Sequence, residues 1–180
     1  MRTFNSEGIV IKRINVGEAD RILTVFTRRH GKIRVKAKGV RKISSKRSPH
    51  LELLNFSRFV FHEGRMMPLL IEAQSSCSFD HIKDDLTKVG FAYHLCELID
   101  GLCPENADHP LIFDLFYETL HKLQLESDIA PIIHGFEVKL LTFLGFWSKS
   151  NYDKNTDTTG FIEGILERRL RSRRLLFRLQ

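Results

Sequence analysis

The stretch that decides the fold of this chain runs Gly31-Lys32-Ile33-Arg34-Val35-Lys36-Ala37-Lys38. Its basic and apolar residues alternate, which is the period of a β-strand with one buried face and one exposed face. We therefore expect the apolar side chains to enter a core and the basic side chains to form a ladder on the surface. The apolar members are Ile33, Val35 and Ala37, and the basic members are Lys32, Arg34, Lys36 and Lys38.

Further strand-like segments lie on both sides of this stretch. Turn residues separate them, and a long basic loop at residues 39–49 follows the central stretch. Five strands with a long loop between the third and the fourth predict a small closed β-barrel. The other four strands are expected at residues 8–14, 21–27, 55–62 and 66–74.

The apolar period becomes helical from about residue 78 onward. Strands followed by helices indicate an α+β protein with a β part and then an α part. We therefore divide the chain into a barrel domain at residues 1–77 and a helical domain at residues 78–180. Helical stripes are expected at residues 79–100, 111–123, 132–144 and 161–179, with a polar loop at 151–160.

Positive charge is concentrated in residues 21–51, which hold eleven Lys and Arg residues and no Asp or Glu. Residues 52–162 are acidic, with eight basic and seventeen acidic residues, so the net charge of +6 conceals a strong polarity. A concentrated basic surface attracts polyanions, because bound phosphates release their counterions. We predict a nucleic-acid site at Lys32, Arg34, Lys36, Lys38, Arg41, Lys42, Lys46 and Arg47. Nearby aromatic residues, most of them expected in the core, offer stacking for bases: Phe26, Phe56, Phe59 and Phe61.

Signals for catalysis and for metal binding are weak. No Cys-x-x-Cys pair is present, which excludes a zinc ribbon, and no Gly-x-Ser-x-Gly nucleophile motif occurs. Gly31-Lys32 lacks the first glycine and the Ser or Thr of a phosphate-binding loop. We therefore expect a binding protein without a cofactor or a metal. A hypothesis from another class is a small metal-dependent hydrolase built on two His-x-x-Glu pairs, His94/Glu97 and His134/Glu137.

A second basic cluster lies near the C-terminus, where residues 163–180 carry a net charge of +4. One interpretation is a solvated helix end, where cations suit the helix dipole. The alternative is a second contact for DNA or for an acidic peptide. No apolar run approaches the roughly 20 residues that span a bilayer, and the N-terminus has no apolar signal region, so we expect a cytoplasmic protein.

Several short motifs follow one another in a characteristic order. They are Glu7-Gly8-Ile9-Val10, residues 17–27, Gly31-Lys32-Ile33, residues 37–42 and the hairpin at residues 59–73. In this order they resemble the N-terminal domain of the bacterial recombination and repair mediator RecO. The run 136–146, which ends in Leu144-Gly145-Phe146, is similar to a helix of the same family, and residues 170–173 resemble its basic C-terminal segment.

The resemblance implies an OB-fold followed by an α-helical domain. It also implies a non-enzymatic mediator that binds single- and double-stranded DNA, anneals complementary strands and helps to load recombinase onto DNA coated by single-strand-binding protein. The implied partners are RecR and the acidic C-terminal tail of the single-strand-binding protein, and the implied location is the cytoplasm, in association with the nucleoid. An OB-fold module for RNA or the ribosome is the alternative.

We expect an acidic tail to avoid the acidic helical surface and to dock at local cations. The candidates, which also serve as a possible second DNA contact, are Lys122, Lys139, Arg168, Arg171, Arg173 and Arg174. Many members of the family carry a four-Cys zinc module after the Leu-Gly-aromatic step. Here residues 147–160 contain no Cys, so the resemblance does not extend to a structural zinc.

Overall fold

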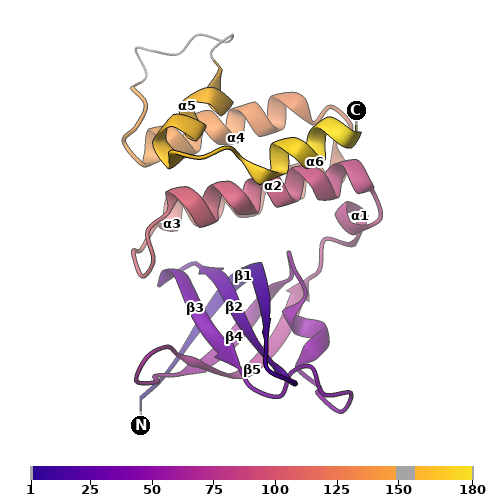
Figure 1. The fold of residues 1–180 in the computed structure, drawn as a ribbon, viewed down its shortest axis with the longest axis vertical. Helices are drawn as coiled ribbons and strands as arrows, with labels where there is room; N and C mark the ends of the chain where they lie inside the picture. Colours follow the sequence, from indigo (N-terminus) through magenta and orange to yellow (C-terminus); the bar gives the residue numbers. More distant parts are fainter. Residues whose placement is uncertain (1, 149–156, 180) are drawn as a thin grey trace. The chain divides into compact units, whose positions relative to one another are not determined.

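The computed structural model describes residues 2–148 and 157–179. These residues form two compact units, a barrel and a set of helices (Figure 1). The first unit comprises Met1–Ser78 and Pro104–Pro110, and the second comprises Phe79–Cys103 and Leu111–Gln180. The short segment Pro104–Pro110 thus interrupts the helical part of the sequence and packs with the strands.

The first unit contains a closed five-stranded barrel with the strand order β1-β2-β3-β5-β4. Neighbouring strands pair antiparallel except β3 and β5, which pair in parallel where Lys36 faces Leu69. This is the topology of an OB-fold, so the fold expected from the sequence is confirmed. The strands are β1 (Thr3–Val16), β2 (Asp20–Thr27), β3 (Gly31–Ala37), β4 (Phe56–His62) and β5 (Leu69–Cys77), with the 3-10 helix η1 (Ser48–Leu51) between β3 and β4.

Strand β1 closes the barrel by pairing with two neighbours. Its residues 3–9 pair with β4, and its residues 8–16 pair with β2. The register with β2 shifts between Val10 and Lys12. Such a β-bulge bends a strand and increases its twist, which allows one 14-residue strand to reach both partners.

The core of the barrel consists of buried aliphatic and Phe side chains. Ile33, Val35 and Ala37 of β3 belong to it, so the predicted inward face of the central stretch is confirmed. Phe59 and Phe61 of β4 stack in this core with ring centroids 5.6 Å apart. Because burying one large apolar side chain contributes about 1.5–3 kcal/mol, this alternation determines which face of β3 is directed to the outside.

The second unit is helical. Its longer helices bury a core that includes Phe113, Phe116 and Phe136. Within the described ranges, no helix combines the length and the apolar character that crossing a bilayer requires. The helices are α1 (Asp80–Lys83), α2 (Leu86–Leu102), α3 (Pro110–Leu125), α4 (Ala130–Phe143), α5 (Thr158–Leu166) and α6 (Arg171–Leu179).

The C-terminal region differs from the single helix expected after residue 160. It forms two helices, because α5 ends at Leu166 and Glu167 takes a left-handed conformation with φ 52°. Residues 158–160, expected in a polar loop, form the first turn of α5. The side chain of Asp157 starts this turn by accepting a 2.9 Å hydrogen bond from the N–H of Gly160. Residues 151–156 of the expected loop lie outside the described residues.

Candidate nucleic-acid interface

The outer face of β3 carries the predicted cations from residue 34 onward. Arg34 is exposed, Lys36 is half-buried, and Lys38, which directly follows the strand, is exposed. They alternate with the buried Val35 and Ala37, as a strand with one solvated face requires. This part of the ladder therefore lies on the surface of the barrel.

Lys32 is the exception, and the expectation that it belongs to the exposed ladder is wrong. Its residue surface is only 6% exposed. The segment Pro104–Pro110 lies against it, because Lys32 forms an isolated parallel bridge with Glu105 and its carbonyl accepts a 2.9 Å hydrogen bond from the N–H of Asn106. The period of a strand does not reveal a covering segment that comes seventy residues later in the chain.

Asp20, which was not among the predicted site residues, binds the chain at the end of the ladder. Its Oδ1 accepts a 2.8 Å hydrogen bond from the N–H of Gly39, and its Oδ2 lies 3.1 Å from Nζ of Lys36. The hydrogen bond from Gly39, followed by the one from Lys36, lowers the pKa of the Asp20 carboxyl group. Lys36 is thus partly neutralised. In the sequence, only its position immediately before the acid-free stretch at residues 21–51 indicates that Asp20 could pair with one of these cations.

The basic loop after β3 is tied to the turn between β1 and β2. The backbone N–H of Arg41 donates to the carbonyl of Ala19 at 2.9 Å, and its Nη1 donates to the carbonyl of Gly17 at 3.0 Å. Two neighbouring cations in the loop, Lys42 and Lys46, are exposed. The loop therefore presents its lysines from a fixed backbone.

Arg47 is half-buried, and its guanidinium group binds backbone carbonyl groups. Nη1 donates to the carbonyl of Leu70 on β5 at 2.8 Å, and Nη2 donates to the carbonyl of Lys38 at 2.8 Å. Arg47 therefore holds the two ends of the loop together, although the sequence suggested a phosphate contact. Four of the eight predicted residues are exposed, and no hydrogen bond or ion pair of their side chains is among the contacts described for residues 2–148 and 157–179: Arg34, Lys38, Lys42 and Lys46.

Most aromatic side chains near the basic stretch are buried. Phe26, Phe59 and Phe61 are fully buried, which excludes them from stacking on bases in this structure, and Phe56 is half-buried. The loop instead exposes a large aliphatic side chain, Ile43. The surface built by β3 and its loop is consequently suited to a charged backbone rather than to base stacking.

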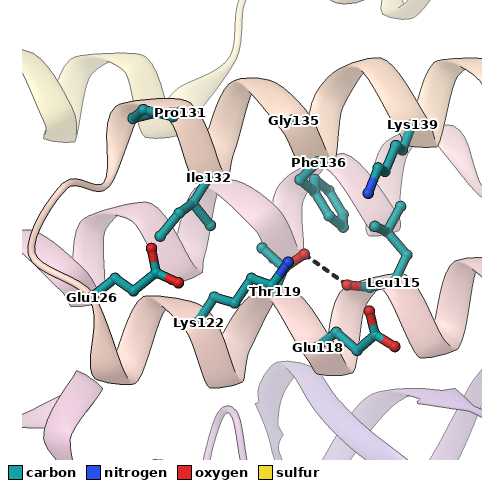
Figure 2. Close-up of a pocket in the computed structure, with 10 residues that line it drawn as sticks. All are labelled: Leu115, Glu118, Thr119, Lys122, Glu126, Pro131, Ile132, Gly135, Phe136 and Lys139. Carbon is teal, nitrogen blue, oxygen red and sulfur yellow. Dashed lines mark hydrogen bonds between the residues drawn. The ribbon is translucent and has the colours of Figure 1, made fainter.

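In the helical unit, two of the predicted cations line one pocket. Figure 2 shows Lys122 of α3 and Lys139 of α4 reaching into the space between these helices, seventeen residues apart in sequence. The pocket has a volume of about 280 Å³, and the buried ring of Phe136 forms part of its wall. Glu118 and Glu126 also line it.

The C-terminal arginines are partly engaged in ion pairs. Nη1 of Arg168 lies 2.6 Å from Oε1 of Glu97, and Nη1 of Arg173 lies 3.1 Å from Oε2 of Glu163. Arg171 and Arg174 are exposed. The cluster is therefore less available to an anion than the run of arginines in the sequence suggested.

The two His-x-x-Glu pairs do not assemble into a metal site. The structure pairs His94 with Glu137 across helices, with Nε2 of the imidazole 2.7 Å from Oε1 of the carboxylate, while Glu97 turns to Arg168. His134 keeps a buried Nε2 without a hydrogen-bond partner. Over residues 2–148 and 157–179, no three His, Cys, Asp or Glu side chains are arranged to hold a metal ion.

Comparison with known proteins gives consistent matches over both units. A family model described as recombination protein O N terminal matches residues 1–79, and one described as recombination protein O C terminal matches residues 83–153. Proteins named DNA repair protein RecO are 34% identical over 148 residues in Acetivibrio thermocellus and 36% identical over 143 residues in Dehalococcoides mccartyi.

These alignments cover most of this chain but not most of the relatives. The Acetivibrio alignment covers 81% of this chain and 59% of the relative, and the Dehalococcoides alignment covers 79% and 56%. A third protein of the same name, from Roseiflexus sp., is 32% identical over 145 residues, which are 81% of this chain and 51% of the relative. The chain thus spans little more than half the length of the curated relatives it matches.

Proposed function

This chain belongs to the recombination protein O (RecO) family, and we propose that it acts in DNA repair as a non-enzymatic, DNA-binding mediator of recombination. It binds single- and double-stranded DNA, anneals complementary strands and helps to load recombinase onto DNA coated by single-strand-binding protein. Its partners are RecR and the acidic C-terminal tail of the single-strand-binding protein, and it works in the cytoplasm at the nucleoid.

The observation that carries this proposal is the group of exposed cations on the OB barrel. Arg34 projects from β3, and Lys38, Lys42 and Lys46 follow on a loop that Arg47 and Arg41 hold in place. A fixed group of cations binds a phosphate backbone without sequence preference, because each phosphate that it neutralises releases counterions. Lys36 contributes less, since Asp20 already pairs with it.

The experiment is a salt titration of single-stranded DNA binding combined with a strand-annealing assay. Four phosphate contacts predict a log–log slope of about −3 on single strands. Arg34→Glu, Lys38→Glu, Lys42→Glu and Lys46→Glu together should remove most of this slope and most of the annealing activity. An affinity for DNA that is flat between low and moderate salt contradicts the proposal.

Arg65 provides the matched control on the same barrel. It is an exposed arginine on the hairpin between β4 and β5 and is not one of the four proposed contacts. Arg65→Glu changes the net charge in the same direction, so it should leave the salt slope and the annealing rate nearly unchanged. Competition between DNA and RNA oligomers of one sequence tests the RNA-binding alternative, because a preference for RNA requires recognition of the 2′-OH.

For the acidic tail, we propose the pocket between α3 and α4 as the docking site. Lys122 and Lys139 supply cations on two facing helices, and the wall of Phe136 supplies apolar surface for side chains of a peptide (Figure 2). The C-terminal cluster is the weaker candidate, because Glu97 and Glu163 already pair with Arg168 and Arg173.

Fluorescence anisotropy with a labelled peptide of the tail distinguishes the two sites. Lys122→Glu with Lys139→Glu should weaken binding by about tenfold or more, because two contacts of about 1 kcal/mol are lost or reversed. Arg171→Glu with Arg174→Glu alters two exposed arginines of the C-terminal cluster and should leave the affinity unchanged. The opposite pattern moves the docking site to that cluster.

A further inference from the structure

A second group of arginines lies at the other end of the β2–β3 hairpin. Arg28 and Arg29 belong to the turn after β2, and Arg58 projects from β4. All three side chains are exposed, and they line one surface pocket of about 350 Å³. The remaining lining residues are Asn5, Ser6 and Glu7 of β1. Arg28 and Arg29 belong to the basic stretch at residues 21–51 and lie outside the eight residues predicted to bind nucleic acid.

The turn that carries Arg28 and Arg29 is held in a defined conformation. The hydroxyl of Thr27, which is fully buried, donates to the carbonyl of Gly31 at 2.9 Å and accepts from the N–H of His30 at 3.0 Å. The N–H of Arg28 donates to the carbonyl of Glu7 at 3.0 Å, which ties the turn to β1. The two guanidinium groups therefore extend from a preorganised backbone.

The pocket carries an excess of positive charge. Its lining residues include three arginines and one acidic residue, Glu7, whose Oε1 lies 3.5 Å from Nη2 of Arg58. This ion pair is solvent-exposed, with 70% of the Arg58 side chain accessible, so it contributes little and competes weakly with an incoming anion. Guanidinium groups bind phosphate through paired N–H donors, and Asn5, which also lines the pocket, carries a side-chain amide that can donate.

This pocket is separate from the surface made by β3 and its loop. The β2–β3 pairing begins at Thr27 and Gly31 and ends at Arg21 and Ala37, next to Lys38. The two ends are six residue steps apart along the strand, which corresponds to about 20 Å. Lys38 and the loop lysines thus lie at the end of the hairpin opposite to the arginine pocket, and Arg34, which pairs with Thr24, lies between the two ends.

We propose that Arg28, Arg29 and Arg58 form a second phosphate-binding site that holds the backbone of a second DNA strand. This inference rests on the proposed function, because annealing brings two strands onto one protein while the β3 surface engages the first. An arginine-lined pocket about 20 Å along the hairpin from the end that carries Lys38 allows the two strands to be held at once at different ends of the hairpin.

The test uses Arg28→Gln, Arg29→Gln and Arg58→Gln together. Glutamine avoids placing a carboxylate at position 58 opposite Glu7, where like charges across two strands destabilise. We expect the affinity for one labelled single strand to change less than threefold and the annealing rate to fall about tenfold. A parallel variant with lysine at the three positions keeps the charge and should retain part of the annealing rate, because only the paired guanidinium donors are lost.

A matched pair of single variants controls for charge. Arg29→Gln and Arg65→Gln each neutralise one exposed arginine on a hairpin turn of the barrel, and only Arg29→Gln should slow annealing. Unchanged annealing in the triple variant overturns the second site. A parallel fall in single-strand affinity and annealing overturns the assignment to a second strand, since the arginines then belong to the first site. If the triple variant anneals normally and the variant with Glu at Arg34, Lys38, Lys42 and Lys46 also binds DNA normally, the proposed function fails together with this inference. If the triple variant anneals normally but the β3-surface variant loses DNA binding, only the second site is contradicted.

Discussion

The carboxylate of Glu97 on α2 caps the first turn of α6 by accepting a 2.8 Å hydrogen bond from the backbone N–H of Ser172. The N–H of Arg171 donates to the same carboxylate at 3.0 Å, and Arg168 pairs with it at 2.6 Å. Burial raises the pKa of Glu97, but the hydrogen bonds from Arg168, Arg171 and Ser172 outweigh it and lower the pKa to about 2. This single carboxylate therefore attaches the last described helix to α2.

The lowered pKa of Glu97 predicts a pH dependence of stability. Because the folded-state pKa lies below the unfolded value of about 4.5, the stabilisation is present above pH 4.5 and is lost as the pH falls toward 2. Glu97→Gln should reduce the free energy of unfolding by about 1–3 kcal/mol at pH 7, discounted for the solvent exposure of Arg168. In urea titrations, the difference from the unaltered chain should shrink between pH 5 and pH 2. A difference that is constant over this range rules out the carboxylate as its source.

His94 and Glu137 form a buried polar pair whose loss should be costly. His94 also contacts the hydroxyl of Ser172 through Nδ1 at 2.9 Å, and Thr158 donates to the second oxygen of Glu137. His94→Leu leaves the carboxylate without its imidazole partner, so we expect a loss of about 2–4 kcal/mol in the free energy of unfolding.

Two further variants test this explanation by thermal denaturation. His81→Leu removes an exposed histidine from α1 and should change stability by less than about 0.5 kcal/mol. Adding Glu137→Leu to His94→Leu removes the unpaired group and should recover part of the loss. If the double variant is as unstable as the sum of the single ones, the pair is not coupled.

The barrel could be predicted because its strongest signal is local. Val35 and Ala37 alternate with Arg34 and Lys36, and a strand with one buried face follows directly from that period. The burial of Lys32 could not be predicted in the same way, because it depends on the distant segment Pro104–Pro110. Periodicity predicts on which face of a strand a residue lies, whereas contacts with segments far apart in the sequence determine whether that residue is exposed.

The candidate sites were predictable by charge but not by geometry. Composition placed Arg47 among the phosphate contacts, yet its guanidinium binds the carbonyls of Lys38 and Leu70. From the sequence, Lys122 and Lys139 were two separate cations. In the structure, α3 and α4 bring them to one pocket. Side-chain donors directed into the fold and those directed to solvent look alike in a sequence.

Arg47 should affect DNA binding through the loop rather than through a phosphate. Arg47→Ala removes the donors to Lys38 and Leu70, so we expect a loss of about 1–3 kcal/mol in the free energy of unfolding. Lys46→Ala, at the exposed neighbouring position, should leave stability unchanged and lower the salt slope of DNA binding by about 0.7. Denaturant titrations and salt titrations of both variants separate the two roles. Equal stability of the two variants contradicts the structural role of Arg47.

Gly31 is required at the point where the segment Pro104–Pro110 contacts the barrel. It has a φ of 59°, and a Cβ at this position would lie 1.7 Å from the carbonyl oxygen of Ala107. Gly31→Ala should therefore cost about 2–4 kcal/mol, because both the backbone conformation and the contact are unfavourable. Gly17→Ala is the matched control, with a φ of 56° and no atom within 4 Å of the added Cβ, and should cost about 1 kcal/mol. Similar melting temperatures for the two variants contradict a close approach of Ala107.

Gly135 offers a way to close the pocket between α3 and α4 without disturbing the fold. It lies in α4 on the lining of the pocket, and a Cβ built on it meets no atom within 4 Å (Figure 2). Gly135→Ala should raise the free energy of unfolding by about 0.5–1 kcal/mol, since glycine is unfavourable inside a helix. Gly135→Leu places a larger side chain in the opening and should weaken binding of the acidic peptide while the chain stays at least as stable. Calorimetric titration of the peptide into both variants checks this, because a pocket that is not the docking site predicts the same affinity for alanine and leucine.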